Sequence, residues 1–157
     1  MLTTIKSLRQ SNKAGGHFVI VASTYNARYV DSMLKAAQAT LKRAGVAGIE
    51  VIRVPGAFEI PVVASALVRR LNPRVSAIIA LGVILRGATT HAQHIGESVT
   101  QALLSIQVNS LVPVVHEVLL LENEQQARER CLDAKRNRGL EAAQTALQMA
   151  DVMRQLG

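Results

Sequence analysis

The sequence of 157 residues predicts an α/β domain with a parallel four-stranded sheet. One observation is a set of short continuous apolar runs, such as residues 78–85, which are typical of strands buried on both faces. The second observation is the helical spacing of apolar residues between these runs, as in Ile95, Val99 and Leu103. Because the two patterns alternate along the chain, we expect right-handed crossovers between parallel strands.

Each element follows from its own local pattern. Strands are expected at residues 17–23, 48–53, 78–85 and 112–118. Helices are expected at about residues 28–44, 61–71, from 91 onward, 124–131 and 140–155. Gly45 and the Asn72-Pro73 pair end the first two helices. Residues 1–16 are predicted to be an N-terminal arm and residues 17–157 a single domain.

Composition narrows the class of protein. Apolar residues make up 49% of the chain, too many for a disordered tail. No apolar run approaches the ~20 residues of a membrane span. The N-terminal stretch lacks the apolar core and cleavage site of a signal peptide, so we expect a cytoplasmic protein. The single cysteine, Cys131, excludes an intramolecular disulfide.

The net charge of +7 indicates an anionic partner. Nucleic acid is disfavoured because only two Tyr and two Phe are available for base stacking. The basic residues are also scattered, apart from Lys135, Arg136 and Arg138. A phosphorylated small molecule fits the charge as well, and a surface that simply keeps the protein soluble is the plainer alternative.

Ligands of open parallel sheets bind beyond the carboxyl ends of the strands. The unusual residues of this chain collect there, in segments 23–26, 54–59, 83–91 and 116–121. The small polar loop 86–91 precedes a helix, so backbone N–H groups, hydroxyls and the positive end of the helix dipole would face one spot. An anion is the natural ligand of such a loop, and His91 could carry protons to it.

Several of these residues also have a plainer interpretation. Tyr25 could stack on a flat heteroaromatic ring or pack on the edge of the domain. Glu59 could bind a polyol or be a first-turn acid that the helix dipole favours. Arg130 could grip a phosphate with its guanidinium fork or face solvent.

The histidines need the same caution. Taken singly, His91, His94 and His116 each fit a capping or packing role. A metal site would need further ligands, and the sequence offers no convincing set. We therefore expect no metal centre.

The ordered set of motifs resembles the lumazine synthase family. The matching segments are Val54-Pro55-Gly56-Ala57-Phe58-Glu59-Ile60-Pro61, then Leu81-Gly82 with Arg86-Gly87-Ala88-Thr89-Thr90-His91, then Glu122-Asn123 with Gln126-Ala127 and Glu129-Arg130, and finally Asn137 with Gly139. Their order and spacing hold from about residue 17 to residue 155. Any one motif is weak, whereas the ordered set is highly specific.

The resemblance implies a flavodoxin-like three-layer α/β/α sandwich. It also implies a reaction of riboflavin biosynthesis, in which 5-amino-6-(D-ribitylamino)uracil condenses with 3,4-dihydroxy-2-butanone 4-phosphate. The products are 6,7-dimethyl-8-ribityllumazine, phosphate and water. No metal or organic cofactor takes part, and riboflavin synthase is a candidate partner.

The resemblance further implies roles for individual residues. Tyr25 would stack on the pyrimidine and His91 would move protons. The other substrate contacts would be made by Ala57, Phe58 and Glu59 with the ribityl chain, by the backbone of Val83, Ile84 and Leu85 with the ring, and by Ala88, Thr89 and Arg130 with the phosphate. The site would lie between two subunits of a pentamer, with His116 and Arg130 supplied by the neighbour.

The sequence departs from the family pattern at four single residues and in one linker. Tyr25 stands where the family usually has Phe, and His116 stands where an aromatic residue is frequent. Glu117 replaces a small residue, so this wall of the site becomes more polar and titratable. Arg138 replaces a usual lysine and keeps its charge. The linker 132–136 lacks the usual glycines, which puts the higher assembly in doubt more than the reaction.

Assembly is expected from surplus apolar surface. Leu104 and Val108 lie beside the main apolar stripe of the third helix, and one sheet cannot cover both. By resemblance the unit is a pentamer or a multiple of it, with a shell of sixty slightly favoured. The rival hypotheses are a scaffold with little activity and a module that binds nucleic acid or a flavin.

Overall fold

The computed structural model describes residues 15–157, which contain a parallel sheet in the order β2-β1-β3-β4. Its strands are β1 (His17–Ser23), β2 (Gly48–Val54), β3 (Ala77–Leu85) and β4 (Val114–Leu121). Phe18 of β1 pairs with Ile49 of β2 on one side and with Ala77 of β3 on the other. This confirms the predicted parallel four-stranded sheet and leaves β2 and β4 as its outer strands.

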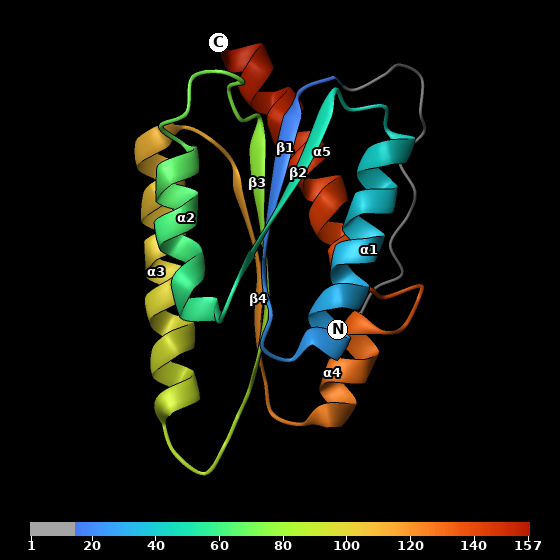
Figure 1. Cartoon of the computed structure of the whole chain (residues 1–157), viewed down its shortest axis with the longest axis vertical. Helices are drawn as coiled ribbons and strands as arrows, with labels where there is room; N and C mark the ends of the chain where they lie inside the picture. The colour runs from blue at the N-terminus through green and yellow to red at the C-terminus, as the bar shows by residue number, and fades with distance from the viewer. Residues whose placement is uncertain (1–14) are drawn as a thin grey trace.

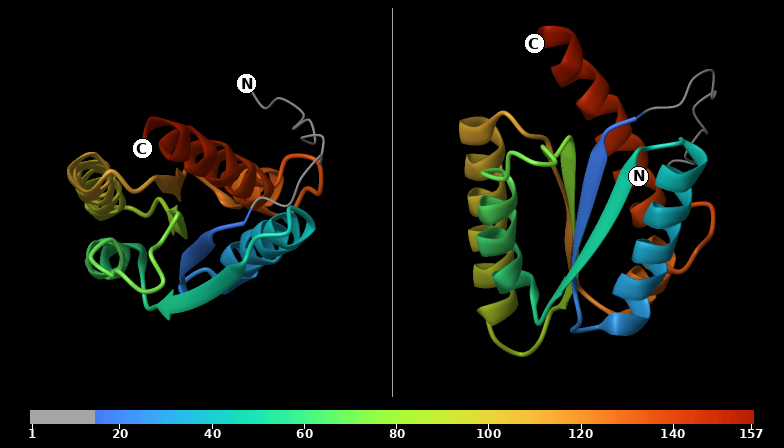
Figure 2. Two further views of the ribbon diagram at one scale, coloured as in Figure 1. Left: turned by 90° about the horizontal axis from the view of Figure 1, so that it is seen from above. Right: turned by 45° about the horizontal axis from the view of Figure 1, so that its top comes forward.

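Helices cover both faces of the sheet (Figure 1). One face carries η1 (Ala57–Glu59, a 3-10 turn), α2 (Ile60–Leu67) and α3 (His91–Ser110), and the other carries α1 (Ala27–Arg43), α4 (Glu124–Cys131) and α5 (Arg138–Leu156). Figure 2 shows the helix, sheet and helix layers from above. The expected flavodoxin-like three-layer sandwich is therefore confirmed.

Each face of the sheet has its own apolar core. Successive strand residues point to opposite sides, so Ile20 packs with α1, α4 and α5, while Val21 packs with α2 and α3. Ile79 and Ile78 of β3 divide in the same way. All four side chains are fully buried. The two central strands are therefore covered on both sides, as their continuous apolar sequences predicted.

The predicted end of the second helix was wrong. α2 ends at Leu67 instead of about residue 71. The N–H groups of Arg69 and Arg70 donate to carbonyls three residues back, Ala66 O at 3.2 Å and Leu67 O at 3.1 Å. This bonding pattern tightens the chain into a turn before the helix could continue.

The predicted bounds of the fourth strand were also wrong. β4 begins at Val114, two residues later than expected, because Pro113 has no N–H to donate to a ladder. It continues to Leu121, because Leu119–Leu121 pair with the end of β3. The other helices and strands lie within two residues of their expected bounds.

The start of α5 packs very closely against α1. A Cβ placed on Gly139 would lie 2.0 Å from the carbonyl oxygen of Met33, so only glycine fits. Asn137 caps the same helix end by accepting the Gly139 N–H at 2.8 Å. The backbone of α5 is thereby fixed at its N-terminal end.

Several apolar side chains remain exposed on the helices. Leu104, Val108 and Leu111 lie uncovered on or just after α3, as do Val152 and Leu156 on α5. None of the described helices is long and apolar enough to cross a membrane. The predicted arm, residues 1–16, lies outside the described residues except for Gly15 and Gly16, so the division into arm and domain stays a prediction.

Candidate active site

The carboxyl ends of the four strands meet at one edge, the lower edge in Figure 1. There the loop after β1 is joined to the loop after β2: Thr24 N–H donates to Val54 O at 2.8 Å and Tyr25 N–H donates to Pro55 O at 3.0 Å. Asn26 joins the same loop to β3, because its Nδ2 donates to Val83 O at 2.7 Å. Three strand ends thus form one connected structure, which we call the ring half of the site.

Tyr25 and Glu59 both lie against Gly56 within the ring half. A Cβ on Gly56 would lie 2.9 Å from two carbon atoms of the Tyr25 ring and 3.0 Å from Glu59 Oε2. The Gly56 N–H donates to that carboxylate oxygen at 2.9 Å, which fixes η1. Glycine at 56 therefore lets an aromatic ring and a carboxylate both approach the backbone closely.

The aromatic surface of the ring half faces outward. Tyr25 is 65% exposed and Phe58 is 64% exposed, whereas Ala57, next to Phe58 in the sequence, is buried. An exposed ring held on a rigid backbone can stack on a flat ligand without reorganising first. Glu59 is also exposed and can accept hydrogen bonds from hydroxyl groups.

The second part of the edge is the loop between β3 and α3, which we call the phosphate half. Residues 86–90 are all exposed, and a Cβ on Gly87 would meet nothing within 4 Å. The loop is joined to the sheet at its start, where Arg86 N–H donates to Leu121 O at 2.8 Å and Arg86 Nε donates to Glu122 at 3.1 Å. Beyond Arg86 the loop projects from the sheet.

The phosphate half ends at the N-terminus of α3. Thr89 Oγ1 accepts the His91 N–H at 3.3 Å, and Thr90 Oγ1 lies 3.2 Å from His94 Nε2. His91 is the first residue of this 20-residue helix and is exposed. The positive end of a helix with hydroxyls and an imidazole beside it suits an anion whose protons must move.

β3 connects the two halves through its last residues. Val83 is buried, while Ile84 and Leu85 are half-buried. The Val83 carbonyl already accepts a hydrogen bond from the Asn26 amide, so this carbonyl is partly occupied before a ligand ring binds beside it. The structure thus brings together all the predicted site residues of segments 25, 57–59, 83–85 and 88–91 at one edge.

His116 lies elsewhere on β4. It is five residues before the end of the strand, roughly 17 Å along it from the loops. Its Nδ1 accepts the Val118 N–H at 3.0 Å, and its Nε2 lies 2.7 Å from Thr100 Oγ1, which donates to Gly96 O at 2.7 Å. These bonds require a neutral ring with the proton on Nε2, and burial lowers the pKa of His116 in the same sense.

A hollow of about 450 Å³ lies between α3 and β4, next to His116. Thr100 and Val118, which bond to His116, line it together with Arg86 at the start of the phosphate half. The hollow therefore runs from the phosphate half toward His116. Within one chain, however, His116 does not reach the loops that carry Tyr25 and His91.

Arg130 also stands apart from the loops. It is half-buried on α4, which packs with α1 and α5 on the face opposite α3 (Figure 1). Arg130 forms none of the ion pairs found among residues 15–157. A single chain does not bring Arg130 to the side of the sheet where α3 begins.

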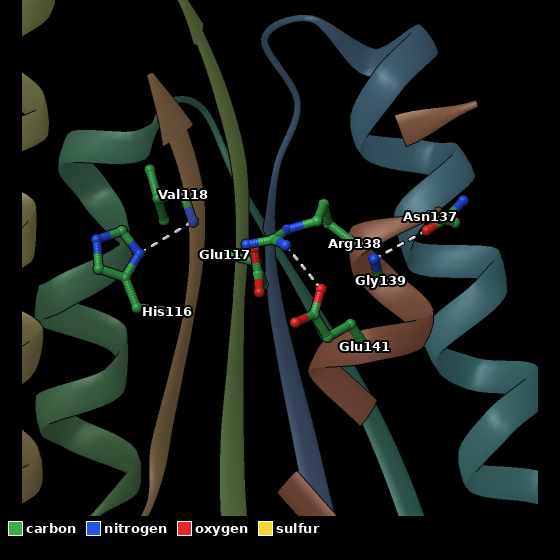
Figure 3. A network of polar contacts seen from close by, with 7 residues as sticks. All are labelled: His116, Glu117, Val118, Asn137, Arg138, Gly139 and Glu141. Carbon is green, nitrogen blue, oxygen red and sulfur yellow. Dashed lines mark hydrogen bonds and ion pairs between the residues drawn. The ribbon is translucent and has the colours of Figure 1, made fainter. Parts of the chain in front are cut away.

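Arg138 is held by two carboxylates (Figure 3). Its Nε donates to Glu117 Oε2 at 3.3 Å and its Nη1 donates to Glu141 Oε2 at 2.7 Å. Glu117 lies on β4 and points toward α5, on the face opposite His116. The adjacent residues His116 and Glu117 therefore face opposite sides of the outer strand.

The sequence over residues 15–154 matches the family model of 6,7-dimethyl-8-ribityllumazine synthase. The chain belongs to the lumazine synthase family. This confirms the family predicted from the ordered motifs. With it the predicted function is confirmed as that of a 6,7-dimethyl-8-ribityllumazine synthase, a transferase of riboflavin biosynthesis.

Individual lumazine synthases align over most of their length. The chain is 39% identical to the 6,7-dimethyl-8-ribityllumazine synthase of Xylella fastidiosa (strain 9a5c), over 91% of this chain and 93% of that protein. It is 41% identical to the enzyme of that name from Halorhodospira halophila, over 88% of this chain and 89% of that protein. The Mycobacterium avium (strain 104) protein is 39% identical, over 91% of this chain and 88% of its own length.

Sequence reasoning missed two features of this lumazine synthase site. Asn26 was taken only as a loop residue, yet it adopts a left-handed backbone (φ 58°) and joins β1 to β3. An asparagine between a strand and a helix is a usable signal, because Asn tolerates that conformation. The ion pair of Glu117 with Arg138 was also missed, and no local pattern indicates it.

No group of three or more potential metal ligands lies within residues 15–157.

Proposed function

We propose that the two halves of this edge bind the two substrates of lumazine formation. The pyrimidine stacks on the exposed face of Tyr25, and its ribityl chain runs along Ala57, Phe58 and Glu59. The backbone of Val83, Ile84 and Leu85 borders the ring. The observation that carries this proposal is that Tyr25 and Glu59 both lie against Gly56, which presents a stacking surface and a hydroxyl acceptor near each other.

The phosphate half takes 3,4-dihydroxy-2-butanone 4-phosphate. Ala88 and Thr89 hold the phosphate at the start of α3, where the helix dipole favours an anion. Arg130 and Arg138 add positive charge, and His116 forms a wall of the site. Within one chain the two arginines lie on the other face of the sheet. Because one chain does not place Arg130 and His116 at the loops, we assign the contributions of these two residues to a neighbouring subunit.

The reaction needs positioning more than strong chemistry. An amine of the pyrimidine adds to the ketone with loss of one water, and phosphate then leaves. The second amine adds to the remaining carbonyl and loses a second water as the ring closes. Holding both reactants together in the right orientation can lower the activation barrier by about 7–11 kcal/mol. His91, exposed beside the phosphate half, transfers the protons of these steps and adds a factor of about 10²–10⁴.

A shared site requires an oligomer. We propose a pentamer or a multiple of it, and the exposed Leu104, Val108 and Leu111 support a contact surface along α3. A shell of sixty is slightly favoured on the length of linker 131–139. Light scattering after gel filtration tests this, and a monomer or simple dimer would contradict the shared site. A cytoplasmic location and a partnership with riboflavin synthase stay predictions from the resemblance.

The activity is tested directly. Purified full-length protein, given both substrates without added metal or cofactor, should form the lumazine, as followed by its absorbance. EDTA should leave the rate unchanged. A rate no greater than the spontaneous reaction at neutral pH would contradict the proposal and favour the scaffold hypothesis.

A further inference from the structure

Glu117 is a buried carboxylate next to an arginine of the proposed phosphate site. It is 7% exposed on β4, and its strand neighbour on β3, Leu81, carries no charge. Arg138 donates to it at 3.3 Å and to Glu141 at 2.7 Å (Figure 3). One guanidinium therefore serves two carboxylates, of which only Glu117 is buried.

The other groups near Glu117 lie on α4 and α5. The pKa of Glu117 is raised to about 7, chiefly by burial, with the charge of Arg138 opposing the rise and that of Glu141 adding to it. Cys131 on α4 stays a neutral thiol, because burial raises its pKa to about 12. The positive charge of Arg130, on the same helix, lowers the pKa of Cys131, but by less than burial raises it. The charge of this cluster consequently changes near neutral pH, and Glu117 is the group that changes it.

A guanidinium engaged by carboxylates is less available to a phosphate. Arginine binds oxyanions through a planar fork of N–H groups, and two of its nitrogens, Nε and Nη1, are already used here. A substrate phosphate at Arg138 would have to share these donors or displace a carboxylate. Ionised Glu117 therefore competes with the phosphate for the same cation.

We propose that Glu117 is a positioning residue that limits how strongly Arg138 binds the phosphate of the butanone substrate. This inference rests on the proposed function, in which Arg138 belongs to the phosphate site. Glu117 does not touch substrate and acts only through Arg138. A chain with a small residue at position 117 would leave only Glu141 to hold Arg138, so Glu117 lowers the phosphate affinity of this enzyme.

The pH dependence has a defined sign. Below about pH 7 Glu117 takes up a proton and loses its charge, and Arg138 is released toward the phosphate. Above it Glu117 is ionised and holds Arg138. The substrate phosphate also loses charge as pH falls through about 6, which has the opposite effect. Wild type and variant must therefore be compared at each pH.

The test is the Michaelis constant of each substrate at pH 6 and pH 8 for wild type and Glu117→Gln. Glutamine keeps the shape and removes the charge. We expect the KM for the butanone phosphate to fall about threefold at pH 8 and less at pH 6, with the KM for the pyrimidine unchanged. An equal ratio of variant to wild type at both pH values would overturn the proposal, because a merely structural role has no such profile.

Two controls isolate the route through Arg138. Glu141→Gln removes the exposed carboxylate from the same guanidinium and should have the smaller effect. In an Arg138→Ala background, Glu117→Gln should no longer change the KM for the butanone phosphate. A Glu117 effect that persists without Arg138 would show that Glu117 acts some other way.

Inorganic phosphate gives a readout independent of turnover. Calorimetric titration of the assembled protein at pH 8 should show tighter phosphate binding by Glu117→Gln than by wild type. If Glu117→Gln fails to fold, Glu117→Ala replaces it with the same expectation. Absence of any lumazine would sink the proposed function, whereas normal lumazine formation with unchanged phosphate binding in the variant would sink only this inference.

Discussion

The two halves of the active-site edge differ in how much of their structure one chain supplies. In the ring half, backbone and side-chain hydrogen bonds join three strand ends, and Tyr25 rests on Gly56. In the phosphate half, the loop 87–90 is exposed and projects away from the sheet. The cations assigned to it, Arg130 and Arg138, lie on the other face of the sheet.

The difference shows which half of the site is ordered before its substrate binds. A flat ring needs a rigid surface before it arrives, since stacking gains little if the platform must first be ordered. A phosphate is bound by charge, which acts over a longer range and can be supplied by a neighbouring subunit. We therefore expect substitutions in the two halves to affect different substrates.

The largest effect should come from His91, which belongs to the phosphate half but acts on both reactants. We expect His91→Ala to lower kcat about 100-fold or somewhat less, because proton transfer is lost while positioning remains. Steady-state kinetics across pH 6–8 would measure it, with circular dichroism to verify the fold. His94→Ala is the matched control and should lower kcat much less. Unchanged turnover would return His91 to a capping role.

Arg130→Ala should separate the substrates. A hydrogen bond to a charged group contributes about 1.5–3 kcal/mol, so we expect the KM for the butanone phosphate to rise about tenfold or more. The KM for the pyrimidine should stay near wild type. Arg128→Ala, an exposed arginine on the same helix, is the control. If both constants stay unchanged, Arg130 is only a surface charge and the comparison fails.

A pair of glycine variants tests the rigidity of the ring half. Gly56→Ala places a methyl group 2.9 Å from the Tyr25 ring, so the ring must move, whereas Gly87→Ala meets nothing within 4 Å. With a cost of about 1 kcal/mol, Gly56→Ala should raise the KM for the pyrimidine about fivefold. Gly87→Ala should leave it near wild type. Equal KM values for the pyrimidine in the two variants would mean that the contact with Gly56 does not position the Tyr25 ring for stacking.

The smallest effect is expected for Tyr25→Phe. Stacking depends on the ring and not on its hydroxyl, so the KM for the pyrimidine should change by no more than about twofold. Tyr25→Ala removes the stacking surface and should raise the same constant clearly more. Similar constants for the two variants would place the pyrimidine away from Tyr25.

The fold was predictable where one local pattern decided the structure. β1 and β3 are covered on both faces, and their continuous apolar runs located them to within one residue. The end of α2 was not predictable, because the sequence Val68-Arg69-Arg70-Leu71 fits both a last helical turn and the tight turn that replaced it. β4 was placed too early because Leu119–Leu121 could equally have been a loop until their pairing with β3 was known.

The site was predictable as a set of segments but not as a set of contacts. The order of parallel strands was enough to place Tyr25, Glu59 and His91 at one edge. The bond from Asn26 to Val83 spans 57 positions, and the bond from Arg138 to Glu117 spans 21. Such contacts depend on how helices cross the sheet, which residue spacing does not encode.

The position of His116 bears on how other molecules can meet the outer strand. Ile78 N–H donates to Pro113 O and Arg86 N–H donates to Leu121 O, and with the parallel register this leaves the N–H groups of Val114, His116, Val118 and Leu120 on the open side of β4. Gln107 accepts the Val114 N–H at 2.9 Å and the His116 ring accepts the Val118 N–H at 3.0 Å. An incoming strand would have to displace both side chains before it could extend the sheet. Two backbone donors of the open border are thereby withheld from an added strand, which disfavours edge-to-edge growth of the sheet.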